Sequence, residues 1–162
     1  MAKCIDSSGV EFACPVTFSA PSGSVQSQYV VQRYVSQLIT QAALSAGATC
    51  TVALTGEPTG MIPVACYVVT DETTTSSVGA TTGLTVEVGI VGDPDFHMVS
   101  TSVFGAAGRR EAYAGVGIGA YRAADAIVAK FTAVGAGSED CAHISNLNMY
   151  VVLYYISVAT EV

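Results

Sequence analysis

The stretch Gly83-Leu-Thr-Val-Glu-Val-Gly-Ile-Val-Gly-Asp-Pro-Asp95 decides the fold class that we predict for this chain. Apolar and polar residues alternate along it, with the period of a β-strand that buries one face. The stretch ends in Gly92-Asp-Pro-Asp95, where glycine and proline impose a turn and the aspartate side chains can bond the local backbone. We therefore predict a strand followed by a turn. The apolar positions of the strand are Leu84, Val86, Val88 and Ile90.

Similar apolar or β-branched runs recur along the chain, separated by turn signals, which makes about eight strands. This spacing favours an antiparallel sandwich or barrel over βαβ units. The polar tract 71–83 is too hydrophilic for a core, so we expect it to be an exposed loop. The other predicted strands span 50–55, 62–70, 96–104, 112–121, 126–133 and 147–158.

The first part of the chain is the least regular. Residues 1–24 contain two prolines and two Ser-Gly pairs, which predicts an extended N-terminal arm, with one possible short strand within 12–18. This arm is either a loosely ordered terminus or a segment that crosses onto a neighbouring subunit. Residues 25–162 are predicted to form a single β-sandwich domain. Within 25–45, apolar pairs recur every four residues, which favours a short helix, although the many β-branched residues favour a strand.

Composition narrows the classes of partner. The 162 residues include 13 Asp and Glu against 6 Lys and Arg, for a net charge of −7, so nucleic-acid binding is not expected. Only 12% of residues are charged while 51% are hydrophobic, which indicates that other subunits cover part of the surface. No apolar run is long enough to span a bilayer, so a membrane partner is not expected either.

The sequence motifs that could indicate a metal, cofactor or catalytic site are weak in this chain. Asp93, Asp95 and His97 stand at i, i+2 and i+4, and 139–143 holds a second polar cluster, but both look like ordinary loops, so we predict no metal and no cofactor. Gly115–Ala120 matches a dinucleotide fingerprint formally but lacks the following helix and βαβ context. The five cysteines are an odd number without C-x-x-C spacing, so reduced, buried thiols are expected. We predict that the protein is not an enzyme.

Two tyrosine-bearing strands are the candidate subunit interface. The last strand is apolar on both faces, whereas a strand at the edge of a two-layer antiparallel sandwich alternates with polar residues. Either it is a central strand under the 71–83 loop, or one face meets another subunit, where tyrosine is favoured. In 113–121 a glycine-lined face bounded by tyrosines would allow a close approach. The predicted interface residues are Tyr113, Tyr121, Tyr150, Tyr154 and Ile156.

Four segments of the chain form a pattern when taken together: Leu84–Asp95, Ala106-Ala-Gly-Arg-Arg110, Ala123–Ala133 and Leu147–Tyr155. This pattern resembles small structural proteins of tailed bacteriophages, of the capsid decoration or cement type. The resemblance implies an all-β, antiparallel jelly-roll-like β-sandwich that opens with strands, against the helix expected within 25–45. It also implies a homotrimer that binds the major capsid protein on the surface of the virion and is made in the host cytoplasm. No catalytic residues are implied.

Two other functions remain open at this point. A head-fibre or tail-associated receptor-binding domain of the same kind of virus would use the Thr- and Ser-rich tract 71–83 to contact a host surface. A cupin-like jelly roll would bind a metal or small ligand through His97 and His143, but it needs several convergent ligands that these two distant histidines do not supply.

Overall fold

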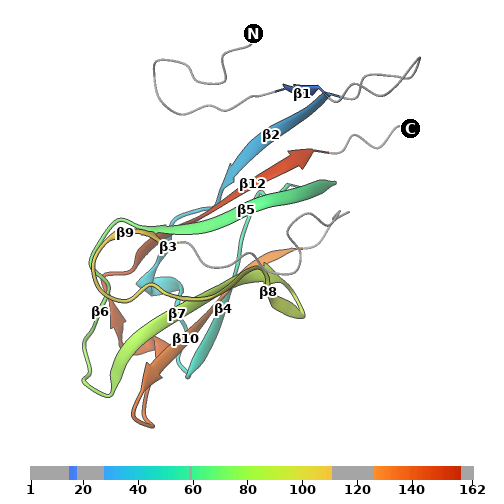
Figure 1. The fold of residues 1–162 in the computed structure, drawn as a ribbon. Coiled ribbons are helices and arrows are strands. Elements are labelled where there is room, and N and C mark those ends of the chain that lie inside the picture. Colours follow the sequence, from blue (N-terminus) through green and yellow to red (C-terminus); the bar gives the residue numbers. More distant parts are fainter. Residues whose placement is uncertain (1–14, 18–27, 59, 111–125, 158–162) are drawn as a thin grey trace.

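The computed structural model describes residues 15–17, 28–58, 60–110 and 126–157. Within these ranges the chain is almost entirely β-structure, and its helices are two short 3-10 turns. Figure 1 shows two sheets packed face to face, with β2, β12 and β5 in one layer and β4, β7, β8 and β10 in the other. The turns are η1 (Gln41–Ala43) and η2 (Cys141–His143).

The first sheet has the strand order β1-β2-β12-β5-β9, and β3 continues along the β2 edge of β12. The second sheet has the order β4-β10-β7-β8, and β6 pairs with β11 in a small ribbon. All of these pairs are antiparallel. The bounds are β1 Pro15–Thr17, β2 Gln28–Val35, β3 Ile39–Thr40, β4 Thr49–Ala53, β5 Met61–Thr70, β6 Thr75–Ser76, β7 Thr81–Ile90, β8 Asp93–Ser102, β9 Gly108–Arg110, β10 Ile127–Gly135, β11 Ile144–Ser145 and β12 Asn148–Ser157.

Leaving the short β1, β3, β6 and β11 aside, eight strands form two four-stranded sheets, β2-β12-β5-β9 and β4-β10-β7-β8. The chain crosses between the sheets repeatedly, so that the last long strand, β12, inserts between β2 and β5. This is the strand order of a jelly roll. The prediction of an all-β, antiparallel, jelly-roll-like sandwich is confirmed, and the strand expected at 84–90 is β7, with β10 and β8 on either side.

The core lies between the two sheets and is built from alternate residues of each long strand. The second sheet contributes Leu84, Val86 and Val88 from β7 and Phe131 from β10, all fully buried. The first sheet contributes the facing set from β12, which is Met149, Val151 and Leu153. Burial of these apolar side chains is the main force that holds the two sheets together.

The prediction of a helix within 25–45 is wrong. β2 occupies Gln28–Val35, and the only helical turn in the described part of this region is η1. Tyr34 lies in the core opposite Leu153, a position that a strand next to β12 provides. The β-branched residues suit the pleated backbone, and pairing with β12 outweighs the local helical pattern.

The expectation that 71–83 forms an exposed loop is wrong in part. Thr75–Ser76 form β6, and β7 begins at Thr81. Thr74 and Thr81 are buried because the backbone around them is paired, Thr74 with Gly105 and β6 with β11. Short polar residues can be buried in this way when hydrogen bonds satisfy their backbone.

A bulge joins β2 to β3. Along β12, Val152 and Met149 are three residues apart, but their partners Val35 and Ile39 are four apart. Ser36 fills the gap: its amide donates to the Val151 carbonyl at 2.9 Å, and its hydroxyl oxygen accepts from the Val151 amide at 2.9 Å. The serine side chain therefore replaces a missing backbone partner at this point of the ladder.

We expect Ser36→Ala to lower the free energy of unfolding by about 1–3 kcal/mol, because the buried Val151 amide loses its acceptor. Chemical denaturation measures the change. Ser100→Ala, at an exposed position of β8, is the control and should stay within about 0.5 kcal/mol of the wild type. Equal stability of the two variants would contradict the role of the Ser36 hydroxyl.

The turn predicted at Gly92–Asp95 lies at the β7–β8 hairpin, where Gly92 has a φ of 94° and Ile90 pairs with Asp93. The next partners are Val88 and Met98, so β8 carries three more residues than β7 over this interval. The extra backbone lies directly over Gly89, which has no side chain to obstruct it. We call residues 91–95 the hairpin tip.

Candidate interaction surface

The outer face of the first sheet is the candidate functional site. Directly opposed residues on neighbouring strands share a face, so the register places Val152 between Val35 and Tyr67, and Tyr154 beside Arg33. This face points away from the core that Met149, Val151 and Leu153 enter. We call it the tyrosine face, and its members are Val31, Arg33, Val35, Ile62, Ala65, Tyr67, Val69, Arg109, Tyr150, Val152, Tyr154 and Ile156.

The second sheet has an outer face of the opposite character. Its strands place threonines there, and Lys130 donates to Glu87 at 3.1 Å across β10 and β7. This sheet therefore alternates apolar and polar residues, as expected for an antiparallel sheet with one face in water. The first sheet breaks that rule, since most residues of the tyrosine face are apolar or aromatic.

An aromatic stack lies within the tyrosine face. The Arg109 guanidinium carbon lies 3.7 Å from the centre of the Tyr67 ring, a cation–π contact. The Tyr67 ring centre lies 6.0 Å from that of Tyr154, at an angle of 37°. Burial, together with a hydrogen bond to Tyr154, raises the pKa of Tyr67. These contacts order three long side chains on β9, β5 and β12 before any partner binds.

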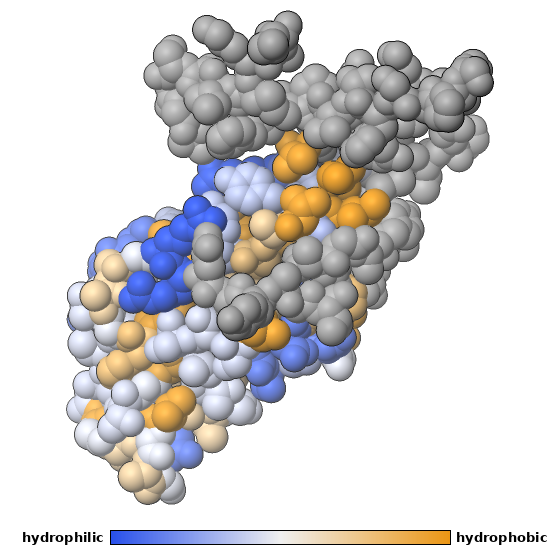
Figure 2. Space-filling model, in the orientation of Figure 1, coloured by the Kyte–Doolittle hydropathy of each residue, from blue (hydrophilic) through white to orange (hydrophobic). Residues whose placement is uncertain are grey.

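Exposure varies across the tyrosine face. Val152 and Tyr67 are only 2% and 7% exposed, whereas Val35 is 41% exposed. Figure 2 shows apolar side chains gathered over the ends of β2, β12 and β5. A contiguous apolar area of this kind on a sheet marks an interaction surface more often than an ordinary solvated face.

The charge of the tyrosine face differs from that of the chain. Its two charged members are Arg33 and Arg109, and it includes no carboxylate, whereas the whole chain carries −7. Arg33 is exposed beside Tyr154. Tyrosine and arginine together are the residues most enriched at binding hot spots, because each combines a large contact area with a polar group.

Three of the five predicted interface residues, Tyr150, Tyr154 and Ile156, lie on the tyrosine face and are partly exposed. Tyr113 and Tyr121 lie outside the described residues. Sequence reasoning missed Tyr67 and the two arginines. A signal for Tyr67 was present, since β5 is apolar at consecutive positions, as β12 is.

Asp140 and His143, which were weighed above as metal ligands and rejected, make structural contacts. Asp140 caps η2, because one carboxylate oxygen accepts from the amides of Ala142 at 2.8 Å and Gly47 at 2.9 Å, and these bonds lower its pKa. His143 Nδ1 lies 3.1 Å from the Thr81 hydroxyl. His97 is buried, while Asp95 is exposed. Within the described ranges, no three His, Cys, Asp or Glu residues are grouped to hold a metal ion.

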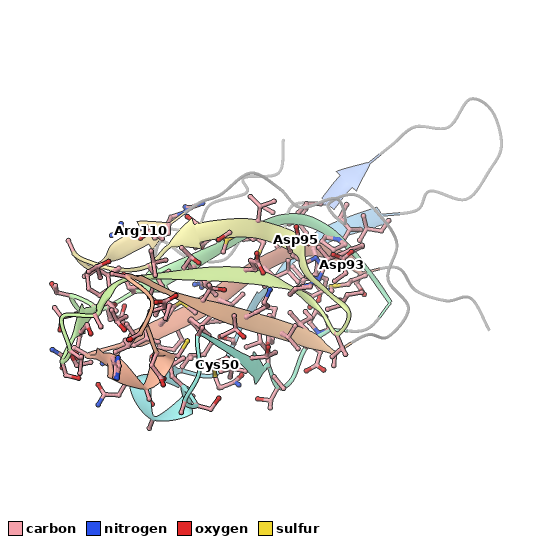
Figure 3. The ribbon with its side chains drawn as sticks, turned by 90° about the horizontal axis from the view of Figure 1, so that it is seen from below. Cys50, Asp93, Asp95 and Arg110 are labelled. Carbon is pink, nitrogen blue, oxygen red and sulfur yellow. The ribbon has the colours of Figure 1, made fainter. Side chains whose placement is uncertain are left out.

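Three cysteines fall within the described residues, and their thiols are free. Cys50 and Cys141 are buried, as the prediction of reduced thiols expected, and Figure 3 shows Cys50 on β4. Burial raises the pKa of the Cys66 thiol to about 12, so this group stays protonated at neutral pH. Protonated thiols are poor nucleophiles, which argues for packing roles.

Comparisons with protein-family models, with curated proteins and with solved structures found no match for this chain. Among the described residues, no helix is long and apolar enough to cross a membrane. The jelly-roll strand order and the tyrosine face are therefore the observations from which a function can be inferred.

Proposed function

We propose that this protein is a non-enzymatic structural component of a bacteriophage virion that binds and stabilises the capsid shell as a homotrimer. The observation that carries the adhesive role is the tyrosine face, an apolar and aromatic surface on a sheet whose other face is already buried. Covering such a surface is worth about 25 cal/mol per Å2 of apolar area before the costs of association. The identity of the partner, the major capsid protein, is supported by the resemblance of four segments to phage decoration proteins.

The chemistry of the tyrosine face suits adhesion. Burial and the hydrogen bond to Tyr154 raise the pKa of Tyr67, so its hydroxyl stays protonated and holds the two rings together within the face. Arg109 is stacked on that ring and adds a fixed positive group beside it. Pre-ordered aromatic and arginine side chains bind with a small entropy cost.

A homotrimer would multiply this adhesion. Three linked copies present three sets of contacts to a symmetric shell, and after the first has bound, the others bind at a high effective concentration. The N-terminal arm, residues 1–24, is proposed to add contacts beyond its own trimer. Modest affinity at each contact is then sufficient for stable attachment.

We expect Tyr154→Asp to weaken assembly or shell binding by about thirtyfold or more, because it places a charge at the centre of an apolar contact. Sedimentation of the purified protein, alone and mixed with shells that lack it, measures both steps. Thr51→Asp, at an exposed outer position of β4 in the second sheet, is the matched control and should behave as the wild type.

A wild-type protein that sediments as a monomer and has no affinity for shells would overturn the proposed function. Imaging of the intact virion tests the location directly. Density on the capsid surface is the expected result, and density at a head fibre or the tail would instead favour a receptor-binding role.

A further inference from the structure

The hairpin tip, residues 91–95, is a second surface with unusual chemistry. Val91 is 73% exposed, more than any other large apolar side chain among the described residues. Asp95 is exposed close to it in sequence. The insertion in β8 holds the tip in place by laying the backbone of Asp93–Phe96 against Gly89. Bulges of this kind re-aim side chains next to functional sites.

The tip and the tyrosine face have complementary chemistry. The tip exposes an apolar side chain and a carboxylate. The face exposes Val35 and the guanidinium of Arg33, and Tyr150 and Tyr154 are partly exposed beside them. Neither Arg33 nor Asp95 forms an ion pair with another described residue. In Figure 3, Asp95 lies toward one end of the molecule and Arg110, in β9, toward the other. The β9 end of the face is therefore far from the tip of its own chain.

Charge also decides which part of a second copy fits the face. Two copies that each carry −7 repel one another on average, so they approach best where a positive surface meets a negative one. A contact between two identical tyrosine faces would place Arg33 and Arg109 of one copy near the same arginines of the other. A head-to-tail contact instead pairs each tyrosine face with the acidic, apolar tip of the next copy.

We propose that the hairpin tip of one chain docks on the tyrosine face of the next, so that three chains close into a head-to-tail ring. Val91 then packs against the tyrosines, and Asp95 pairs with Arg33 of the neighbouring copy. This inference rests on the homotrimer of the proposed function and identifies the two surfaces that build it. The tyrosine face then holds the trimer together, and the shell is bound by surfaces that the ring leaves exposed. Heterologous contacts of this kind form closed rings when the rotation between neighbours closes.

Charge reversal tests the pairing. Arg33→Glu and Asp95→Arg, made separately, should each raise the protein concentration needed to form trimers at least tenfold. The double variant carries the pair in reversed order and should return to within about threefold of the wild type, since coupled residues are not additive. Analytical ultracentrifugation measures the trimer fraction. Glu72→Arg, at an exposed acidic position outside both surfaces, should leave it unchanged.

Mixing two defective variants distinguishes head-to-tail from face-to-face assembly. Tyr154→Asp damages the face and keeps the tip, whereas Val91→Asp damages the tip and keeps the face. In an equal mixture, the intact tip of Tyr154→Asp can dock on the intact face of Val91→Asp, but no other pairing of tip and face is intact. A ring cannot close, so particles of two chains are expected. A face-to-face contact would leave Val91→Asp fully assembled on its own.

The inference is overturned if Val91→Asp and Asp95→Arg trimerise like the wild type while Tyr154→Asp does not. In that case the homotrimer of the proposed function still stands, but a different part of the neighbouring chain covers the tyrosine face. A monomeric wild type also overturns it, and shell binding alone then decides the proposed function. Thermal melting should show all of these variants folded, because the substituted groups are at least partly exposed.

Discussion

Replacing Phe131 with alanine is expected to lower the free energy of unfolding by about 3–5 kcal/mol. Phe131 is fully buried in the middle of β10, with Cys50 of β4 and Val86 of β7 as its neighbours in the sheet. Its ring fills the space between the two sheets, so truncation removes apolar contacts and leaves a cavity. The stability of a typical domain is only about 5–15 kcal/mol, so this one change removes a large share.

Denaturant unfolding followed by circular dichroism measures this loss. Val134→Ala on the same strand is the control, because Val134 is 45% exposed and the change should cost less than about 1 kcal/mol. A loss below about 1.5 kcal/mol for Phe131→Ala would mean that the surrounding core collapses into the space. The packing described for β10 would then be wrong.

Gly89→Ala is expected to cost about 3 kcal/mol or more. An added Cβ would overlap the Asp93 carbonyl oxygen and would lie 2.6 Å from the Pro94 carbonyl carbon. Both are backbone atoms, so the β8 segment must move as a whole, and overpacking against groups that cannot rotate away costs about 1–3 kcal/mol or more. The hairpin tip would be displaced with that segment.

The matched control is Gly79→Ala, where an added Cβ has no heavy atom within 4 Å. Its stability should stay within about 1 kcal/mol of the wild type in the same thermal and chemical unfolding experiments. If Gly89→Ala unfolds like the wild type, the backbone of 93–96 does not lie over Gly89. If it folds but is destabilised, the proposed head-to-tail assembly should also weaken, since the tip would be displaced from its position over Gly89.

Several strands could be predicted because their patterns are local. β7 alternates apolar and polar residues with a period of two and is bounded by turn residues, and β12 is a continuous apolar run, so both strands could be located from the sequence. The 25–45 segment could not be assigned this way. A four-residue repeat of apolar pairs fits a helical stripe, and only pairing with β12 decides that Tyr34 enters the core from a strand.

The candidate site was predictable to a similar extent. Tyr150, Tyr154 and Ile156 could be predicted from the sequence because a strand with two apolar faces can be recognised within a single segment. Arg109 could not be predicted from the sequence. The apolar run of β5 could have pointed to Tyr67 but not to its place between Arg109 and Tyr154, since β9, β5 and β12 are neighbours only in the assembled sheet. No local pattern reports a cation–π contact between residues more than forty positions apart.

By itself, the sequence determined that this protein is built from antiparallel strands, that the 84–90 strand buries one face and that the last strand is apolar on both. Only the tertiary structure decided the jelly-roll order, the shared face of Tyr67, Tyr154 and Arg109, and the β8 segment laid over Gly89. The physical reason is that the alternation of apolar and polar residues along a strand is a local property, so it can be seen in a short segment of the sequence. Strand order and register depend on the summed pairing and burial of strands far apart in the chain.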